Sequence, residues 1–462
     1  MVSPARAELP GCLGNDKLDD KSMQLSAISY SADVHLSRLL GRPLFSPTNE
    51  GVGKVDDVIV GLRGEDYPVA TGLVAKVGGR RVFVPMQRVA ELSEERIVLA
   101  KSKVDLRGFE RRDGEVLLRE DILGHRLIDV ADAELVRAWD VELRASDEGW
   151  VVSCLDTRRP PRLLGLIRTA GGRPCQDWKA FEPLIGHTPS VRARSAFGRV
   201  VKLKPAQIAD LLEDASHTEG EEILDVVHAD PELEADVFEE LDPDIANRLF
   251  GDKTDEEVAD VVAHMRADDA ADAVAELPQA RRQKVLDLLP VGTRTKVLTL
   301  LGFNATSAGG IMGIDFLTAP KDALVDEALR RIRLAENVQP EALITMHAVD
   351  DANRLFGTVS VIGLLQADPE SRLLDIVDDD PVRVTAAADV VDVTLLMADY
   401  NLMTVPVVDD DNQLLGVITV DDILEATIPE DWRRREPPAH PEPAHTDSEP
   451  NSTETKHSEP RG

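Results

Sequence analysis

Residues 313–428 contain the same order of predicted elements twice, and this repetition restricts the possible folds more than any other feature. Each copy predicts a short strand, a helix, two strands joined by a polar turn, and a final helix. The second copy includes TVPVVDDDNQLLGVITVDDILEAT (404–427), in which two apolar runs flank an acidic turn. Such alternation predicts an α/β arrangement, with one unit over 313–370 and a second over 371–428.

Residues 200–303 have a different pattern, with a helix-start signal near every twelfth residue. Asp230-Pro231 and Asp242-Pro243 are examples, because an Asp side chain caps free N–H groups and Pro fits the first helical turn. Helices of two or three turns are unstable in isolation, so we expect them to stack into an all-α solenoid. Residues 304–312 are expected to bridge this solenoid to the α/β units.

Residues 36–199 are rich in predicted strands and contain an internal repeat. Two phrases recur about 83 residues apart: LLGRPL (39–44) matches ILGHRL (122–127), and VDDVIV (55–60) matches AWDVEL (138–143). The repeat predicts either two small β-barrels, over 36–115 and 116–199, or one duplicated unit. The glycine pair in GLVAKVGGRR (72–81) predicts a hairpin turn. The polar ends, 1–35 and 429–462, are expected to be disordered.

The net charge of −33 excludes nucleic acid as an expected partner, because phosphate groups would be repelled, and favours divalent cations or basic partners. No apolar stretch approaches the roughly 18 residues of a membrane span, and no secretory signal is visible, so a cytoplasmic protein is expected. Cys12, Cys154 and Cys175 show no paired spacing, which predicts neither a disulfide framework nor a thiolate metal site and fits a reducing cytoplasm. No nucleophile motif is present, so an enzyme is not expected.

Three parts of the chain resemble known families. TVPVVDDDNQLLGVITVDDIL is typical of cystathionine-β-synthase (CBS) domains, and residues 203–428 resemble the cytosolic part of MgtE-type magnesium transporters. There an N domain and a bridge, here FNATSAGGIMGIDFLTAP (303–320), precede a CBS pair. The β-rich region resembles the PRC-barrel family. In MgtE transporters the CBS pair leads into a transmembrane channel, so the resemblance here implies the regulatory part without a pore.

The MgtE resemblance implies Mg²⁺ bound between acidic faces of the N domain and the CBS pair. ADDAADAV places Asp268 and Asp272 at i and i+4 on one helical face, with Asp269 beside them. Asp421 and Glu425 have the same spacing in the last helix. Mg²⁺ prefers oxygen ligands and retains several waters, so one or two carboxylates from each face suffice. The alternative is that these acids are helix caps and solvated surface.

An adenine nucleotide is a second candidate ligand, because many CBS domains bind adenosine through the phrase G-x-x-[ST]-x-x-[DN]. The second repeat has this phrase intact, whereas Gly363 replaces the acid in the first. Residues of the second repeat that the resemblance places in the nucleotide site are Thr385, Val405, Val407, Gly416, Thr419 and Asp422. Thr419 and Asp422 equally suit an ordinary helix N-terminus.

These observations lead to three hypotheses. The first is a soluble cytoplasmic regulator that senses Mg²⁺, alone or with an adenine nucleotide, and signals to a partner by domain rearrangement. That partner could be a membrane transporter, and the resemblance implies a homodimer formed through the CBS pair. The second is a ligand-independent scaffold or adaptor that docks a partner through the PRC-like region. The third is a pure nucleotide sensor.

Overall fold

The computed structural model of the chain describes residues 33–63, 66–101, 108–112, 114–158, 175–184, 198–335 and 338–429. The ends that were expected to be disordered lie outside these ranges, except for 33–35 and 429. The chain divides into two compact units, Met1–Leu249 and Phe250–Gly462. Among the described helices, none combines the length and the apolar character that a membrane span requires.

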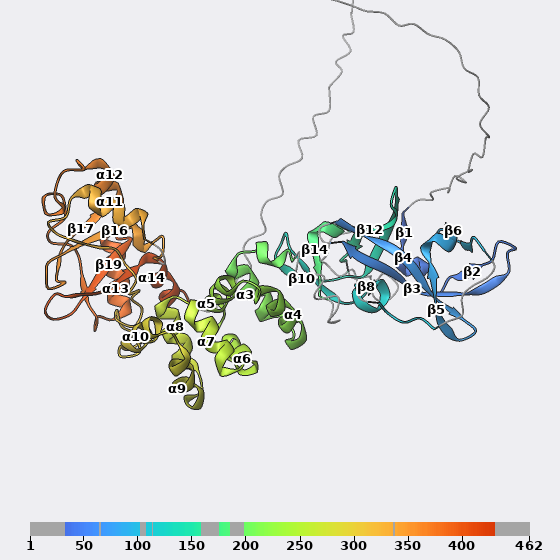
Figure 1. Cartoon of the computed structure of the whole chain (residues 1–462), viewed down its shortest axis with the longest axis horizontal. Coiled ribbons are helices and arrows are strands. Elements are labelled where there is room, and N and C mark those ends of the chain that lie inside the picture. The colour runs from blue at the N-terminus through green and yellow to red at the C-terminus, as the bar shows by residue number, and fades with distance from the viewer. Residues whose placement is uncertain are drawn as a thin grey trace, which may run out of the picture. The chain divides into compact units, whose positions relative to one another are not determined.

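A curled sheet of 11 strands dominates the first unit (Figure 1). Its path is β1-β11-β12-β4-β3-β2-β7-β6, and β13, β5 and β8 pair with β12, β4 and β3. The strands are β1 (Val34–His35), β2 (Pro43–Phe45), β3 (Gly51–Arg63), β4 (Asp66–Val77), β5 (Arg80–Pro85), β6 (Val89–Leu92), β7 (Ile97–Leu99), β8 (Glu115–Leu117), β11 (Asp140–Ser146), β12 (Gly149–Asp156) and β13 (Gln176–Asp177). A separate sheet has the order β10-β9-β14 and comprises β9 (Arg126–Asp129), β10 (Glu134–Arg137) and β14 (Phe181–Pro183).

Strands from both predicted barrel units lie in the larger sheet. β1 pairs with β11, β12 with β4, and β8 with β3. One buried cluster also contains residues of both halves, among them Leu39, Val58, Leu127 and Val141. A shared sheet and a shared core favour one duplicated unit over two separate barrels. The expected hairpin turn is present between β4 and β5, where Gly78 and Gly79 have positive φ of 56° and 81°.

The two halves of this region cap each other's helices. Asp57 of β3 accepts hydrogen bonds from the backbone N–H groups of Arg119 (2.8 Å) and Glu120 (3.2 Å), at the start of the short helix η2 (Leu118–Ile122). Asp140 of β11 accepts one from the Ser37 N–H (3.0 Å), at the start of α1 (Leu36–Leu39). These two aspartates are equivalent positions of the repeated VDDVIV and AWDVEL phrases. The repeat therefore encodes a reciprocal contact between its copies.

Asp57 is only 1% exposed, and burial raises the pKa of its carboxyl to about 6 despite the N–H groups that favour the ion. Because each of these aspartates accepts hydrogen bonds from the start of a helix, replacing either one should destabilise the β-rich region. We expect Asp57→Ala and Asp140→Ala each to reduce the free energy of unfolding by about 1–3 kcal/mol, because each leaves helix-start N–H groups unpaired. Urea denaturation followed by tryptophan fluorescence measures this, since Trp139, Trp150 and Trp178 lie in this region.

Asp147→Ala is the matched control, because Asp147 is exposed in the turn between β11 and β12. Equal urea midpoints of unfolding for the two capping variants and Asp147→Ala would contradict the role assigned to the caps.

The structure corrects the expectation about cysteines. Cys154 of β12 and Cys175, immediately before β13, form a disulfide with their Cα atoms 5.2 Å apart. The prediction of no disulfide was wrong because it relied on sequence spacing. The two residues are 21 positions apart and become neighbours only because β13 pairs with β12. Cys12 lies outside the described residues.

The helical region consists of short helices, as the spacing of start signals predicted. Most have ten residues: α3 (Pro205–Asp214), α4 (His217–Val227), α5 (Pro231–Glu240), α6 (Pro243–Asp252), α7 (Asp255–His264), α8 (Ala267–Glu276), α9 (Gln279–Leu288) and α10 (Val291–Leu300). Caps define the starts: Asp230 accepts from the N–H of Leu233, and Thr254 and Glu257 form a capping box. The most extensive packing is between alternate helices, α3 with α5, α7 with α9, and α8 with α10, and consecutive helices also contact each other.

Two α/β repeats complete the second unit (Figure 1). Each has a three-stranded sheet in which the first strand is parallel to the second and the second is antiparallel to the third. The first repeat comprises β15 (Thr318–Pro320), α11 (Val325–Arg333), β16 (Thr345–Val349), β17 (Leu355–Ser360) and α12 (Val361–Gln366). The second comprises β18 (Val384–Thr385), α13 (Val390–Tyr400), β19 (Thr404–Val408), β20 (Leu414–Thr419) and α14 (Val420–Thr427). This is the predicted order of elements in both copies.

The bridge after α10 is attached to the second repeat. Gly313 exchanges backbone hydrogen bonds with Val417 of β20 at 3.0 and 2.9 Å. Met312 lies so close to Gly416 that a Cβ atom there would be 2.6 Å from the Met312 sulfur. The bridge thus connects the end of the helical stack to β20, the strand that precedes α14, and α8 and α14 lie in the same compact unit.

Candidate metal site

Helix α8 supplies three aspartates to one cavity. Its small apolar residues Ala267, Ala270, Ala271 and Val274 are buried, which leaves the acidic positions on the remaining surface. Asp268 and Asp272 are one helical turn apart. Asp269 forms an ion pair with Arg266, with 2.7 Å between the Asp269 Oδ2 and the Arg266 Nε. Arg266 precedes the helix, so its positive charge lies at the same end as the aspartates.

Helix α14 supplies the facing acids. Thr419 and Asp422 form a reciprocal capping box: the Thr419 N–H donates to the Asp422 Oδ2 at 2.7 Å, and the Asp422 N–H donates to the Thr419 Oγ1 at 3.3 Å. This box holds Asp422 at only 8% exposure, and Glu425 follows one turn later. Asp421, which was predicted as a ligand beside Glu425, is exposed and does not line the cavity.

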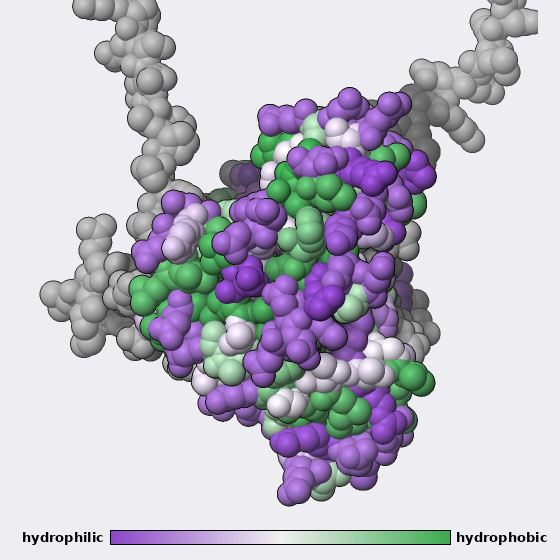
Figure 2. Space-filling model, turned by 90° about the vertical axis from the view of Figure 1, so that its left-hand side faces the viewer, coloured by the Kyte–Doolittle hydropathy of each residue, from purple (hydrophilic) through white to green (hydrophobic). Residues whose placement is uncertain are grey.

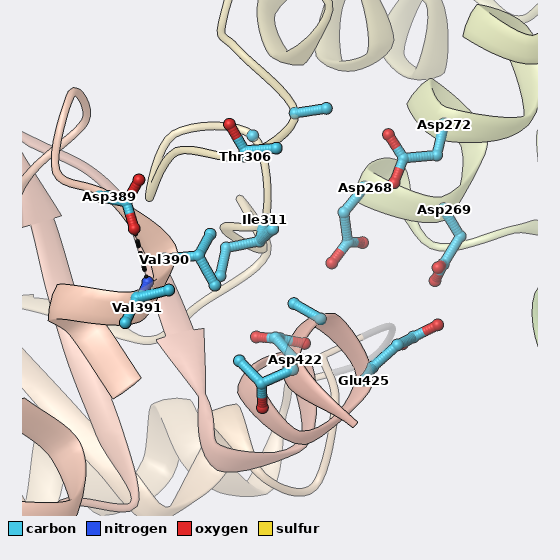
Figure 3. Close-up of a pocket in the computed structure, with 14 residues that line it drawn as sticks. Asp268, Asp269, Asp272, Thr306, Ile311, Asp389, Val390, Val391, Asp422 and Glu425 are labelled. Atoms are coloured by element: carbon cyan, nitrogen blue, oxygen red, sulfur yellow. Dashed lines mark hydrogen bonds between the residues drawn. The ribbon is translucent and has the colours of Figure 1, made fainter. Parts of the chain in front are cut away.

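The acids of both helices line a cavity of about 560 Å³ within the second unit (Figure 3). Figure 3 shows Asp268 and Asp269 of α8 pointing toward α14, and Glu425 of α14 extending toward α8. The bridge and the start of α13 form the remaining wall. The full lining is Asp268, Asp269, Asp272, Ala305, Thr306, Gly310, Ile311, Asp389, Val390, Val391, Asp422, Glu425, Ala426 and Thr427.

Burial and mutual repulsion raise the pKa of several of these carboxyls. Burial raises the pKa of Asp422 to about 7, and the negative charge of Asp268 adds to the effect. Burial, followed by the charges of Asp268 and Glu425, raises the pKa of Asp272 to about 6. Asp272 as a whole is exposed, and only its side facing the cavity is desolvated, so solvent screens part of this repulsion. Desolvation also raises the pKa of Asp268, while Arg266 opposes the shift. When these carboxyls are ionised, the nearby positive charge of Arg266 does not balance their combined negative charge.

The donors fit a hard divalent cation. Every charged group of the lining is a carboxylate, and histidine and cysteine are absent from it. Carboxylate oxygens and water are the ligands of Mg²⁺ and Ca²⁺, whereas softer metals favour nitrogen or sulfur. Asp268, Asp272, Asp422 and Glu425 line the cavity and are the residues that could contribute oxygens to such an ion. Four of the five predicted metal ligands thus lie around one cavity, and Asp422, predicted as a nucleotide ligand, joins them.

The other predicted nucleotide residues have different surroundings. Val405 and Val407 are completely buried in β19, Thr385 is exposed on β18, and Thr419 is buried under its cap. Gly416 is required for the close approach of Met312. Of the six residues, only Asp422 lines the cavity.

Two polar residues of the lining were missed by the sequence reasoning. Thr306 belongs to the bridge, and Asp389 caps α13 by accepting from the Val391 N–H at 2.9 Å. They come together because Ser307 and Asp389 form a β-bridge. Asp389 has the sequence signal of a helix cap, but nothing in the sequence indicates that the bridge folds against it.

Comparisons with known proteins identify the domains around this cavity. Residues 203–306 match the model of the MgtE intracellular N domain, and residues 373–428 match that of the CBS domain. This chain thus carries a region that matches an MgtE N domain and, in its second α/β repeat, one that matches a CBS domain. The MgtE N domain contributes α8, and the CBS domain contributes α13 and α14.

Curated relatives match part of the chain. The magnesium transporter MgtE of Thermus thermophilus is 35% identical over 123 residues, which is 27% of this chain and 27% of that protein. MgtE of Enterococcus faecalis is 31% identical over 126 residues, 27% of this chain and 28% of the relative. The chain thus spans little more than a quarter of the length of the relatives it matches.

Solved structures resemble about half of the chain. The soluble part of a magnesium transporter is 24% identical, covers 51% of this chain and 91% of its own, and has a TM-score of 0.46. The cytosolic domain of the Mg²⁺ channel MgtE in complex with ATP is 26% identical, covers 52% of this chain and 95% of its own, and has a TM-score of 0.47.

The raised pKa values predict a pH-dependent stability. A carboxyl whose folded-state pKa lies above its unfolded value opposes folding once it ionises, so stability falls as the pH rises from about 4 to about 7. We expect Asp422→Asn to reduce this fall, because the amide oxygen retains the cap without the charge. Thermal unfolding in chelator at about pH 5 and about pH 8 measures the difference.

Asp421→Asn is the matched control, because it removes one charge from the same helix outside the cavity. Mg²⁺ should raise the melting temperature more at the higher pH, where the carboxylates are ionised. The same pH profile for Asp422→Asn and Asp421→Asn would contradict the assignment.

Proposed function

We propose that the MgtE N domain and CBS pair of this chain form a cytosolic regulatory module that senses Mg²⁺ at the cavity between α8 and α14. The observation that supports this most directly is the gathering of five carboxylates from these two helices around one cavity. The matched family model describes an intracellular domain, which supports the cytosolic setting. The relatives are magnesium transporters, which favours Mg²⁺ among the hard cations.

The proposed mechanism depends on repulsion. Without a cation, the ionised carboxylates of α8 and α14 repel each other across a partly dry cavity, which favours separation of the two helices. A divalent ion that accepts oxygens from both helices offsets this repulsion and favours the closed arrangement. Ion concentration then sets the population of two arrangements, because the ion binds one of them more tightly. The output is a changed affinity for a partner protein, for which a membrane transporter is one candidate.

A titration with Mg²⁺ tests the proposal. The wild-type chain should become more compact and more resistant to protease as Mg²⁺ rises through the millimolar range, measured by small-angle scattering and limited proteolysis. The double variant Asp268→Asn with Asp272→Asn should require at least about tenfold more Mg²⁺, because two ligands are lost.

The double variant Asp410→Asn with Asp411→Asn is the control, since it removes the same charge from the exposed turn between β19 and β20. Identical titration curves for all three proteins would overturn Mg²⁺ sensing and favour a ligand-independent scaffold that binds its partners equally in chelator.

We also propose that the CBS pair forms a homodimer. Four large apolar side chains on adjacent helices are exposed: Val391 (60%) and Leu395 (58%) on α13, and Leu424 (48%) and Ile428 (38%) at α14. Each pair is one turn apart, and α13 packs against α14, so the four lie on neighbouring surfaces. Figure 2 shows hydrophobic patches among hydrophilic residues on the side of the molecule that carries the CBS pair. Apolar patches of this kind mark association surfaces.

A charge placed in this surface tests the dimer. Leu395→Glu should convert a dimer to a monomer in light scattering after size exclusion, because burying a carboxylate without a partner is costly. Leu298→Glu is the control, because Leu298 on α10 is similarly exposed at 48%. A wild-type monomer, or a dimer that survives Leu395→Glu but not Leu298→Glu, would refute this surface.

An adenine nucleotide remains the second candidate ligand. The cavity volume lies within the usual range for small-molecule sites, and Asp422 of the predicted phrase lines it. The acidic lining would repel bare phosphates, so a nucleotide is expected to bind as its Mg²⁺ complex. Calorimetry with ATP in Mg²⁺ and in chelator separates this case from a pure nucleotide sensor, which would bind equally in both.

A further inference from the structure

The disulfide of the β-rich region has a carboxylate beside it. Glu142 of β11 is the direct strand partner of Cys154 in β12, and Cys175 precedes β13, which pairs with the same strand. One side-chain ligand atom from each of Glu142, Cys154 and Cys175 lies within 4.8 Å of the others. Cys154 is 5% exposed, whereas Cys175 is exposed, so the group has one buried side and one side open to solvent.

The Glu142 carboxylate is held in a fixed orientation. Its Oε1 accepts hydrogen bonds from the Ser153 hydroxyl at 2.7 Å and from the Arg144 Nη2 at 3.1 Å. Its Oε2 lies 3.6 Å from the Cys175 sulfur. A carboxylate with one oxygen anchored and the other directed to two sulfur atoms is typical of a metal ligand supported by neighbouring groups.

Charge considerations differ between the oxidised and reduced forms. A disulfide is neutral, so it tolerates the adjacent carboxylate. Two thiolates and a carboxylate within 4.8 Å would carry three negative charges, which a bound cation would offset. Zn²⁺ binds thiolate and carboxylate together, and a site with three protein ligands and one water is common for this ion.

The backbone at Cys175 supports a specific role for this residue. Its φ is 44°, in the left-handed region that non-glycine residues rarely adopt. Such a conformation is unfavourable for a residue other than glycine and persists where the surrounding structure requires it. Here it presents the sulfur of Cys175 to both Cys154 and Glu142.

We propose that reduction of the Cys154–Cys175 disulfide creates a Zn²⁺ site formed by the two cysteine sulfurs and the Glu142 carboxylate. A dithiol reductant supplies two electrons and two protons: the S–S bond breaks, two thiols form, and the reductant becomes a disulfide. Binding of Zn²⁺ then releases the two thiol protons, and a water completes the coordination. The disulfide and the ion are thus alternative links between β12 and β13, and one replaces the other as the redox conditions change.

This site is independent of the acidic cavity. Thiolates select Zn²⁺ over Mg²⁺, and the cavity between α8 and α14 has no sulfur ligand. Zn²⁺ could still bind the carboxylates of that cavity. The test therefore uses the full-length chain with Asp268→Asn and Asp272→Asn as a common background and includes excess Mg²⁺.

The experiment measures Zn²⁺ bound by this background protein, reduced and then separated from reductant, in competition with a chromophoric chelator. We expect one tightly bound Zn²⁺ after reduction and none in the oxidised form. Cys154→Ser and Cys175→Ser should each abolish tight binding, and Glu142→Gln should weaken it at least about tenfold. Cys12→Ser, at the third cysteine, is the matched control and should bind as the background protein does.

A second measurement requires no cysteine or Glu142 variant. Cd²⁺ added to the reduced background protein should produce the ultraviolet charge-transfer band of cadmium thiolates, and the oxidised protein should not. Absence of this band would overturn the proposal. Equal Zn²⁺ affinity in the reduced background protein and in Cys154→Ser would overturn it as well and would leave the pair as a disulfide only.

Discussion

The second unit depends on like charges that the fold places opposite each other. Helix α8 presents Asp268 and Asp272, and α14 presents Asp422 and Glu425, across one cavity. Burial makes this arrangement unfavourable when the groups are ionised, and the raised pKa values of Asp422 and Asp272 reflect that cost. Protons or a cation bound among these carboxylates would offset that cost, which is the physical basis for proposing a sensor rather than a rigid scaffold.

The β-rich region depends on a different constraint, the exchange of caps between its two halves. Asp57 holds the start of a helix in the second half, and Asp140 holds the start of a helix in the first half. Neither half has its helix capped without the other, so the duplication yields one interlocked structure. The Cys154–Cys175 link lies in this same region, on β12 and beside β13, and it attaches the last segment of the region to the shared sheet.

Much of this architecture was predictable because it depends on local signals. Helix starts such as Asp230 and Thr254 are determined by capping within four residues, and the order of strands and helices in the CBS pair follows from short periodic runs. The aspartates of α8 were predicted to share a helical face because one helical turn separates them. The spacing that Asp421 shares with Glu425 does not show which helical face meets the cavity, and the structure places Asp422 there instead of Asp421.

The elements, their order, the acidic faces and the repeated phrases can be read from the sequence, because they depend on residues close along the chain. Long-range packing places α8 opposite α14, brings Thr306 and Asp389 to the same cavity, and lets Asp57 and Asp140 act across the repeat. It also brings Cys154 together with Cys175 and Glu142. These contacts join residues far apart along the chain. They depend on strand pairing and on the path of the bridge, and neither can be inferred from the spacing of residues in one sequence.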